Sequence, residues 1–256
     1  MINPTRETYF SPEMQMAYMG ASQFKAFTSC EAAALAELRG EHERPASTAL
    51  HVGSYVDAHF EGSLDLFRGQ HPELFTRSGE LKSDYRRAEE IIERIERDPM
   101  FMRYMSGEKQ RIMTGEIAGV PVKIKMDSYH PGRVIVDMKI MRDFEPIWKP
   151  GEGRVSFAEA WGYDIQGAIY QAVEGHALPF IIAGATKETE PDIELISVPQ
   201  HMLDAALKIV EANIGRYADI KRGLIEPERC GKCDYCKRTK VLSRIVSLDE
   251  LTEEVA

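Results

Sequence analysis

Apolar residues recur at steps of three and four positions along five stretches of the chain, which is the pattern of amphipathic helices. Near the N-terminus, Phe24, Phe27, Leu35 and Leu38 would share one side of such a helix. Ser22 precedes them where a side-chain oxygen can cap the first turn. An irregular lead-in over residues 1–20 is expected first, and the predicted helices then cover residues 23–39, 48–67, 81–98, 156–175 and 200–221.

The middle of the chain has a different pattern, in which Gly and Pro separate short segments rich in Ile and Val. Such segments are typical of β-strands and turns. Because helices precede, interrupt and follow these segments, the sequence predicts an α/β fold with a mixed central sheet flanked by helices. One domain over residues 1–256 is expected, and its strands would cover residues 111–118, 120–129, 133–141, 180–186 and 193–198.

A hairpin is predicted where His130-Pro131-Gly132 separates two of these strands, with Gly132 in the left-handed conformation. A three-residue loop would pair Tyr129 with Arg133. Side chains alternate along a strand, so one core face would be formed by Val122, Ile124, Met126, Val134, Val136 and Met138. The other face would carry Lys123, Lys125, Asp127, Asp137 and Lys139. A loop of two or four residues would instead place Asp127 and Asp137 on opposite faces.

Two carboxylates and a lysine on this polar face suggest chemistry. In the predicted register Asp127 and Asp137 are diagonal neighbours, about 7–8 Å apart, which lets them hold one divalent cation. Lys139 points to the same side. This trio suits phosphodiester hydrolysis, in which a cation activates water and a lysine orients that water or stabilises the developing charge. Ordinary strand charges that face solvent are the alternative interpretation.

Composition narrows the class of protein without adding a site. The 256 residues include 32 Lys and Arg and 41 Asp and Glu, a net charge of −9, with 43% hydrophobic residues. These values exclude collagen-like, disordered and disulfide-dense classes. No apolar run reaches the roughly 18 residues of a membrane span, and no signal-peptide pattern is present, so a cytoplasmic protein is expected. Among residues 216–244, nine are Lys or Arg and four are acidic, which suggests either a DNA path or a basic tail.

The order Asp127, then Asp137-Met138-Lys139, resembles the motif of the PD-(D/E)XK nuclease superfamily. Gln166-Gly-Ala-Ile-Tyr170 is similar to the Gln-x-x-x-Tyr motif of its RecB-like branch, and its two polar residues lie one helical turn apart. The resemblance covers about residues 22–245 and looks closest to phage and prophage proteins described as exodeoxyribonuclease VIII-like. It implies a restriction-endonuclease-like fold with its core over residues 22–225 and a metal-dependent DNA exonuclease activity.

The resemblance also implies roles for these residues. Asp127, Asp137 and the backbone carbonyl of Met138 would bind Mg²⁺ or Mn²⁺, and Lys139 would assist the nucleophilic water. Gln166 and Tyr170 would support the site or contact DNA, or else would merely pack on the sheet.

A third metal ligand is expected on an upstream helix. The RecB-like branch has Gly-x-x-x-His there, whereas this sequence reads Gly53-Ser-Tyr-Val-Asp57. Asp57 is the expected ligand, with Glu61 or His59 in reserve, and an oxygen ligand suits Mg²⁺. Because Asp replaces His, a nucleic-acid-binding protein on a decayed nuclease fold is the alternative function.

The cysteines form a second candidate metal site. Cys230, Cys233 and Cys236 have C-x₂-C-x₂-C spacing, and Cys30 is the only other cysteine. The spacing resembles that of [4Fe–4S] proteins, with four-thiolate zinc as the chief alternative and free thiols as the plainest interpretation. Some RecB-like nucleases have the same layout of one N-terminal and three C-terminal cysteines. A cysteine knuckle over residues 226–245 would then be tied to the first helix, with a tail over 246–256.

The expected partners follow from the same resemblance. Linear DNA ends are the expected substrate, with phage-type recombination as the process. A single-strand annealing recombinase and a homo-oligomer are further predictions, and no membrane is expected. An iron–sulfur redox protein is the remaining alternative, which would not need Asp127 or Lys139.

Overall fold

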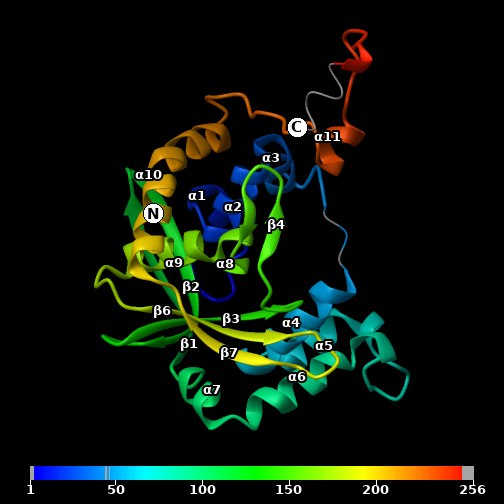
Figure 1. Ribbon diagram of the computed structural model, residues 1–256, viewed down its shortest axis with the longest axis vertical. Coiled ribbons are helices and arrows are strands. Elements are labelled where there is room, and N and C mark those ends of the chain that lie inside the picture. The colour runs from blue at the N-terminus through cyan, green and yellow to red at the C-terminus, as the bar shows by residue number, and fades with distance from the viewer. Residues whose placement is uncertain (1–2, 44, 46, 250–256) are drawn as a thin grey trace.

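A five-stranded sheet crosses the middle of the molecule, and helices cover both of its faces (Figure 1). The computed structural model describes residues 3–43, 45 and 47–249, so the end of the expected tail, residues 250–256, lies outside the described residues. The strands are β1 (Glu108–Ile117), β2 (Val120–His130), β3 (Val134–Met141), β6 (Phe180–Thr186) and β7 (Ile193–Ser197), with β4 (Ile147–Lys149) and β5 (Gly153–Val155) in a separate hairpin.

The helices divide between the two faces of the sheet. They are α1 (Pro12–Ala17), α2 (Ala21–Ser29), α3 (Glu31–Leu38), α4 (Thr48–Glu61), α5 (Leu64–Gln70), α6 (Arg87–Glu96), α7 (Pro99–Tyr104), α8 (Phe157–Ala160), α9 (Tyr163–Glu174), α10 (Gln200–Arg222) and α11 (Asp234–Arg238). Short 3₁₀ helices cover Pro72–Leu74 and Ser83–Tyr85. None of the described helices has the length and apolar character needed to cross a membrane.

The sheet is mixed, as predicted. Its order is β1-β2-β3-β6-β7, and β3 and β6 are parallel whereas the other neighbouring pairs are antiparallel. Parallel neighbours need a crossover connection. Here the connection contains α9, which packs against β1 and β2. This crossover places the helix that carries Gln166 and Tyr170 over the strands that carry the carboxylates.

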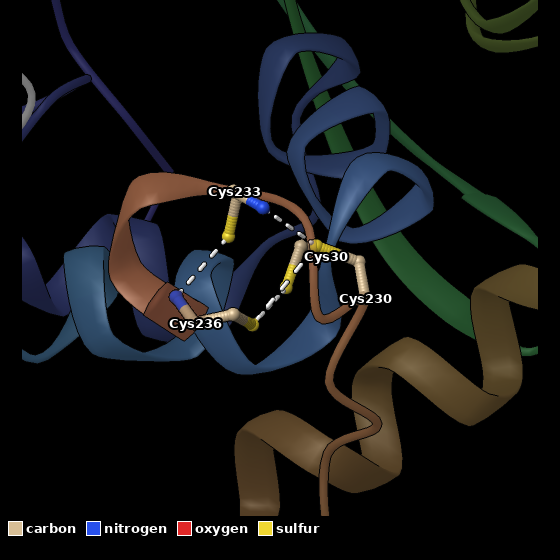
Figure 2. A group of neighbouring side chains, drawn as sticks. All are labelled: Cys30, Cys230, Cys233 and Cys236. Atoms are coloured by element: carbon tan, nitrogen blue, oxygen red, sulfur yellow. Dashed lines mark hydrogen bonds between the residues drawn. The ribbon is translucent and has the colours of Figure 1, made fainter. Parts of the chain in front are cut away.

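A segment near the N-terminus of the chain meets one near the C-terminus. The short helix α11 packs against α3, and the four cysteines lie between these segments (Figures 1 and 2). The predicted tie between the C-terminal knuckle and the N-terminal helix is therefore confirmed.

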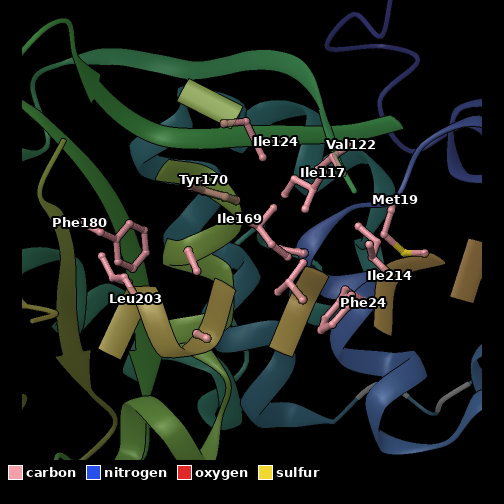
Figure 3. Packing of buried hydrophobic residues seen from close by; sticks show 14 of the residues in the cluster. Met19, Phe24, Ile117, Val122, Ile124, Ile169, Tyr170, Phe180, Leu203 and Ile214 are labelled. Carbon is pink, nitrogen blue, oxygen red and sulfur yellow. The ribbon is translucent and has the colours of Figure 1, made fainter. Parts of the chain in front are cut away.

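Each face of the sheet has its own apolar core. One core lies under α2, α9 and α10 and includes Phe24, Ile124, Ile169 and Phe180 (Figure 3). The other core lies under α4 and α6 and includes Val56, Ile91 and Val136. A sheet buried on both faces does not show a single apolar face and a single polar face in its sequence.

The double burial makes the predicted hairpin faces wrong. Val122, Ile124 and Met126 pack under α9, whereas Val136 and Met138 pack under α4 and α6. The predicted polar face is divided too, because Lys123 is buried and donates to the carbonyl of Tyr9, while Lys125 approaches Glu61 at 3.5 Å.

The hairpin register also differs from the prediction, by two residues. Tyr129 pairs with Ile135 and His130 with Val134, so the loop is Pro131-Gly132-Arg133 rather than residues 130–132. Gly132 has the expected positive φ, 66°. Because side chains alternate with a period of two, a shift of two residues leaves each side chain on its predicted side of the pair. Extended by one residue, this register places Asp127 directly opposite Asp137 rather than diagonal to it.

Three of the predicted helices are interrupted where the backbone leaves the helical conformation. Extended Cys30 separates α2 from α3, and left-handed Gly62 and Gly162 end α4 and precede α9. The helix predicted over 81–98 is shorter, at Arg87–Glu96, and the lead-in contains α1. Ser22 does not cap α2, because Gly20 occupies the N-cap position.

Candidate active site and metal centre

The carboxylate site lies where β2 and β3 diverge. Regular pairing between them extends only from His130–Val134 to Ser128–Val136, after which β2 pairs with β1 and β3 with β6. Diverging strands leave backbone groups that need other partners. The N–H of Met138 donates to Asp127 Oδ2 at 2.8 Å, and the carbonyl of Lys125 accepts from the Tyr170 hydroxyl at 2.9 Å. Where β2 and β3 no longer pair, the side chains of Asp127 and Tyr170 thus supply the missing hydrogen-bond partners.

Asp137 is the most buried carboxylate of this group, with 1% of its surface exposed. Gln166 Nε2 donates to its Oδ1 at 2.7 Å, and Lys139 forms an ion pair with its Oδ2. Gln166 also donates to the Tyr170 hydroxyl at 3.1 Å. The predicted pair on α9 therefore contacts Asp137 and the backbone of β2 by hydrogen bonds.

Helix α4 brings further carboxylates to Asp127. Ser47 caps its first turn, and Gly62 ends the helix. Asp57 and Glu61 are four residues apart, so they lie one turn apart on the side that faces the strands. Asp57, Glu61, Asp127 and Gln110 line one small cavity. His59, the other reserve ligand, points away, because its Nε2 lies 2.8 Å from Glu96 Oε1.

The charges in this site are crowded. Burial raises the pKa of Asp57 to about 8, and the neighbouring Asp127 adds to the rise. Burial likewise raises the pKa of Asp137 to about 6, against the opposing effect of Lys139. Although burial disfavours its ammonium form, Lys139 keeps a pKa above its ordinary value because Asp137 and Asp127 are close. When its three carboxyl groups are all ionised, the group carries more negative charge than Lys139 balances, and a bound cation relieves this excess.

The donor set fits a hard divalent cation. Asp57, Asp127 and Asp137 supply only oxygen, which suits Mg²⁺ or Mn²⁺. The carbonyl of Met138 lies 3.2 Å from Lys139 Nζ and so faces the same group. The three carboxylates do not converge as tightly as the cysteine sulfurs, since Asp127 and Asp137 are each held by hydrogen bonds of their own.

A larger cleft adjoins these residues. Its volume is about 350 Å³, and its lining includes Gly53, Asp57, Lys139 and Lys187. Gly53 and Asp57, the two ends of the motif on the upstream helix, therefore face one cleft.

Two residues near the site were missed from the sequence. Lys25 donates to the Trp161 carbonyl at 3.3 Å, and burial together with the charge of Lys139 lowers its pKa to about 8. It lies on a helix with no motif spacing, so no signal was available. Gln110 precedes the predicted start of its strand at residue 111, whereas β1 begins at Glu108, and that boundary error hid it.

The four cysteine sulfurs lie within 4.8 Å of one another (Figure 2). Cys30 Sγ is 3.6 Å from Cys236 Sγ, and Cys230 Sγ is 3.9 Å from Cys236 Sγ. The backbone N–H of Cys233 donates to Cys230 Sγ, and that of Cys236 donates to Cys233 Sγ. Such bonds stabilise thiolates, the form that binds metal. In the part of the chain that the structure describes, this is the one group of three or more candidate ligand atoms gathered this closely.

Polar contacts fasten the knuckle beside Cys30. Glu31 accepts two hydrogen bonds from Arg216, at 2.7 and 2.8 Å, and one from the N–H of Glu228 at 2.7 Å. The N–H of Ala32 donates to the Glu228 carbonyl at 3.0 Å. The basic stretch 216–244 is therefore partly structural, because Arg216 serves this contact and Lys221 is buried against Gln23.

Comparisons with known proteins agree with this geometry. The model of a family described as "PDDEXK-like domain of unknown function (DUF3799)" matches residues 20–239. The crystal structure of a protein from Eubacterium rectale, titled "Putative exonuclease", matches with a TM-score of 0.93 and 49% sequence identity, over 98% of this chain and 99% of that one. The search of curated proteins found no match.

Proposed function

Because the chain belongs to the family of PDDEXK-like domains, within the PD-(D/E)XK nuclease superfamily, we propose that it is a Mg²⁺-dependent exonuclease that hydrolyses DNA. The observation that carries this proposal is the environment of Asp137. A buried carboxylate that contacts both Gln166 and Lys139, beside Asp127, is costly to fold and has a clear use in phosphodiester hydrolysis. The solved relative titled "Putative exonuclease" supports attack from DNA ends.

Each residue has a proposed role. Asp57, Asp127, Asp137 and the Met138 carbonyl hold the cation, with Glu61 beside them. A bound Mg²⁺ or Mn²⁺ supplies Lewis acidity and lowers the pKa of water. Lys139 orients the nucleophilic water and stabilises the charge that develops on the phosphate. Gln166 keeps Asp137 in place, and Tyr170 fixes Gln166 while closing the opening between the strands.

The cleft of about 350 Å³ is the proposed path of the DNA strand toward these residues. Lys187 lies on its wall and donates to the Ala49 carbonyl at 3.2 Å, which holds a positive charge near the expected phosphates. Linear DNA is therefore the proposed substrate. A recombinase partner, an oligomer, a role in phage-type recombination and a cytoplasmic location stay predictions of the sequence.

At the cysteines the sulfur spacing favours one tetrahedral zinc ion. Thiolates at about 2.3 Å from such an ion lie about 3.8 Å apart, close to the 3.6 and 3.9 Å distances that involve Cys236. A [4Fe–4S] cluster, which the sequence spacing favours, needs its thiolates farther apart. In either case we propose a structural role, because the site joins chain ends rather than facing the carboxylates.

The test is a nuclease assay on end-labelled linear DNA and on closed circular DNA, with Mg²⁺, Mn²⁺ or EDTA. We expect metal-dependent loss of linear DNA alone. Asp137→Ala should lower the rate by about 10³-fold or more, since it removes a cation ligand and unpairs Lys139. Asp137→Asn is a second variant of nearly unchanged shape, and Asp65→Ala, an exposed position in α5, is the control.

The outcomes separate the alternatives. Cleavage of circles would show an endonuclease. DNA binding without cleavage by metal-loaded, folded protein would favour the decayed-nuclease alternative. Normal cleavage by Asp137→Asn and Asp137→Ala would refute the site itself.

A further inference from the structure

Gln110 has an unusual backbone for a residue in a strand. It lies in β1 opposite Asp127, yet its φ is 52°. This is the left-handed region, in which residues other than Gly, Asn and Asp are uncommon. The register of β1 and β2 holds on both sides of it, from Lys109–Ser128 to Arg111–Met126, but Gln110 and Asp127 themselves do not pair. Local strain of this kind is retained where surrounding contacts impose it, and it concentrates at functional sites.

The alternation of side chains is also broken on the partner strand, β2. Met126 and Tyr129 both pack in the core under α9, although regular alternation would send residues three apart to opposite faces. The alternation of β2 is therefore broken next to Asp127, beside the strained Gln110. Asp127 stays on the side of Lys125, toward Glu61, and accepts a hydrogen bond from the Met138 N–H.

The amide of Gln110 is buried with one end unsatisfied. The residue is 6% exposed, and its Nε2 donates to Asp127 Oδ1 at 3.3 Å. An ionised carboxylate accepts hydrogen bonds only, so this contact fixes the amide orientation and turns Oε1 away from Asp127. Oε1 has no hydrogen-bond partner among the described residues. A buried acceptor without a partner in a folded protein points to a water or an ion.

Gln110 itself lines a small cavity. The cavity has about 10 Å³ of space for the centre of a water-sized particle, and Asp57, Glu61 and Asp127 line it together with Gln110. That volume accommodates one water or one cation. A residue with an unsatisfied amide oxygen thus lines one cavity with three carboxylates, a combination that attracts a species that donates hydrogen bonds or carries positive charge.

We propose that Gln110 is a positioning residue of the cation site, whose Nε2 orients Asp127 and whose Oε1 accepts a hydrogen bond from a water bound to the divalent cation. The inference rests on the proposed function, because it needs a cation held by Asp57 and Asp127. It adds a residue on β1 to a site otherwise made by α4, β2, β3 and α9.

The test measures Mn²⁺ binding without DNA, by isothermal titration calorimetry of the full chain purified with its cysteine site loaded. Gln110→Leu keeps the size and loses the amide, and we expect Mn²⁺ affinity to fall about 10-fold or more. Gln110→Gly also loses the amide but removes the backbone strain. It should show the same weakened binding with an unchanged or higher Tm, which a purely structural role for the side chain would not give.

Two further variants make the result specific. Gln110→Glu keeps an oxygen at the Oε1 position and should retain most of the Mn²⁺ affinity. Gln171→Leu is the matched control, since Gln171 is also buried and hydrogen-bonded but lies away from the cavity. It should lower the Tm and leave Mn²⁺ binding unchanged.

The outcomes distinguish this inference from the proposed function. Unchanged Mn²⁺ affinity in both Gln110→Leu and Gln110→Gly would overturn the inference while the cation site stands. Equal losses in Gln110→Glu and Gln110→Leu would overturn the role of Oε1. A wild-type chain that binds no Mn²⁺ and cleaves no DNA would overturn the proposed function as well.

Discussion

The carboxylate site and the cysteine site are built in opposite ways. The carboxylates stand on α4, β2 and β3, and hydrogen bonds from Gln166 and Met138 hold Asp137 and Asp127 before any ion arrives. The cysteines stand on a helix junction and a short knuckle with a five-residue helix, and few apolar residues pack around them. The first site is thus organised by the fold, whereas the second, with its proposed metal bound, would organise part of the fold.

The largest effect that tests this difference between the two sites is expected when one cysteine is replaced. Cys236→Ser should lose the bound metal and lower the Tm by about 10 °C, because a loss of about 3 kcal/mol corresponds to roughly 2–4 °C per kcal/mol in a chain of this size. Elemental analysis for zinc and iron, thermal melts and trypsin digestion report metal, stability and release of the knuckle. Ser29→Ala, at the exposed neighbour of Cys30, is the control.

DNA cleavage by the same variant then sharpens the distinction. At temperatures where Cys236→Ser stays folded, we expect Mg²⁺-dependent cleavage to persist. A folded variant without cleavage would show that the cysteine site takes part in the chemistry and would contradict the proposed division of roles.

A smaller effect is expected where α9 packs on the sheet. A Cβ at Gly167 would come within 2.5 Å of Phe180 and 2.9 Å of Leu203, both in the core. Gly167→Ala should therefore cost about 1–3 kcal/mol in unfolding free energy, through overpacking beside Gln166. Gly215→Ala in α10 is the matched control, because a Cβ there meets nothing within 4 Å. Helix propensity should make it more stable by up to about 1 kcal/mol, as denaturant titration would show.

The smallest effect concerns the ion pair beside the cysteines. Burial opposes ionisation of Glu31, but the hydrogen bonds from Arg216 and Glu228 hold its pKa below its ordinary value. A lowered folded-state pKa contributes stability above the unfolded value, near 4.5, and this stability is lost as pH falls through the folded-state pKa. Glu31→Gln should cost about 1 kcal/mol at pH 7, since Arg216 is partly exposed.

The pH dependence of that cost is the test. Denaturant titrations at several pH values should show the difference from wild type shrinking below about pH 4.5. Glu211→Gln, at an exposed position on the same helix as Arg216, should show no such change. A cost that stays constant with pH would mean that the Glu31 charge contributes nothing.

The five strands of the main sheet and both groups of candidate site residues could be predicted from the sequence because each rests on local spacing, whereas the short strands β4 and β5 were not predicted. Asp137-Met138-Lys139 and the cysteine run could be found without knowledge of the rest of the chain. The faces of the hairpin could not, because both faces of the sheet are buried and the side-chain alternation breaks next to Asp127. The break of the first helix at Cys30 was hidden as well, since the apolar period continues across an extended residue.

The junction of Cys30 with Cys236 also sets an order of events during synthesis. The two residues are 206 positions apart, so a ribosome that adds 5–20 residues per second makes the second about 10–40 s after the first. During that interval α4, the hairpin and α9 are synthesised, while the Cys30 thiol waits for its partners. All residues of the carboxylate site are therefore present in the nascent chain before the four cysteines can come together.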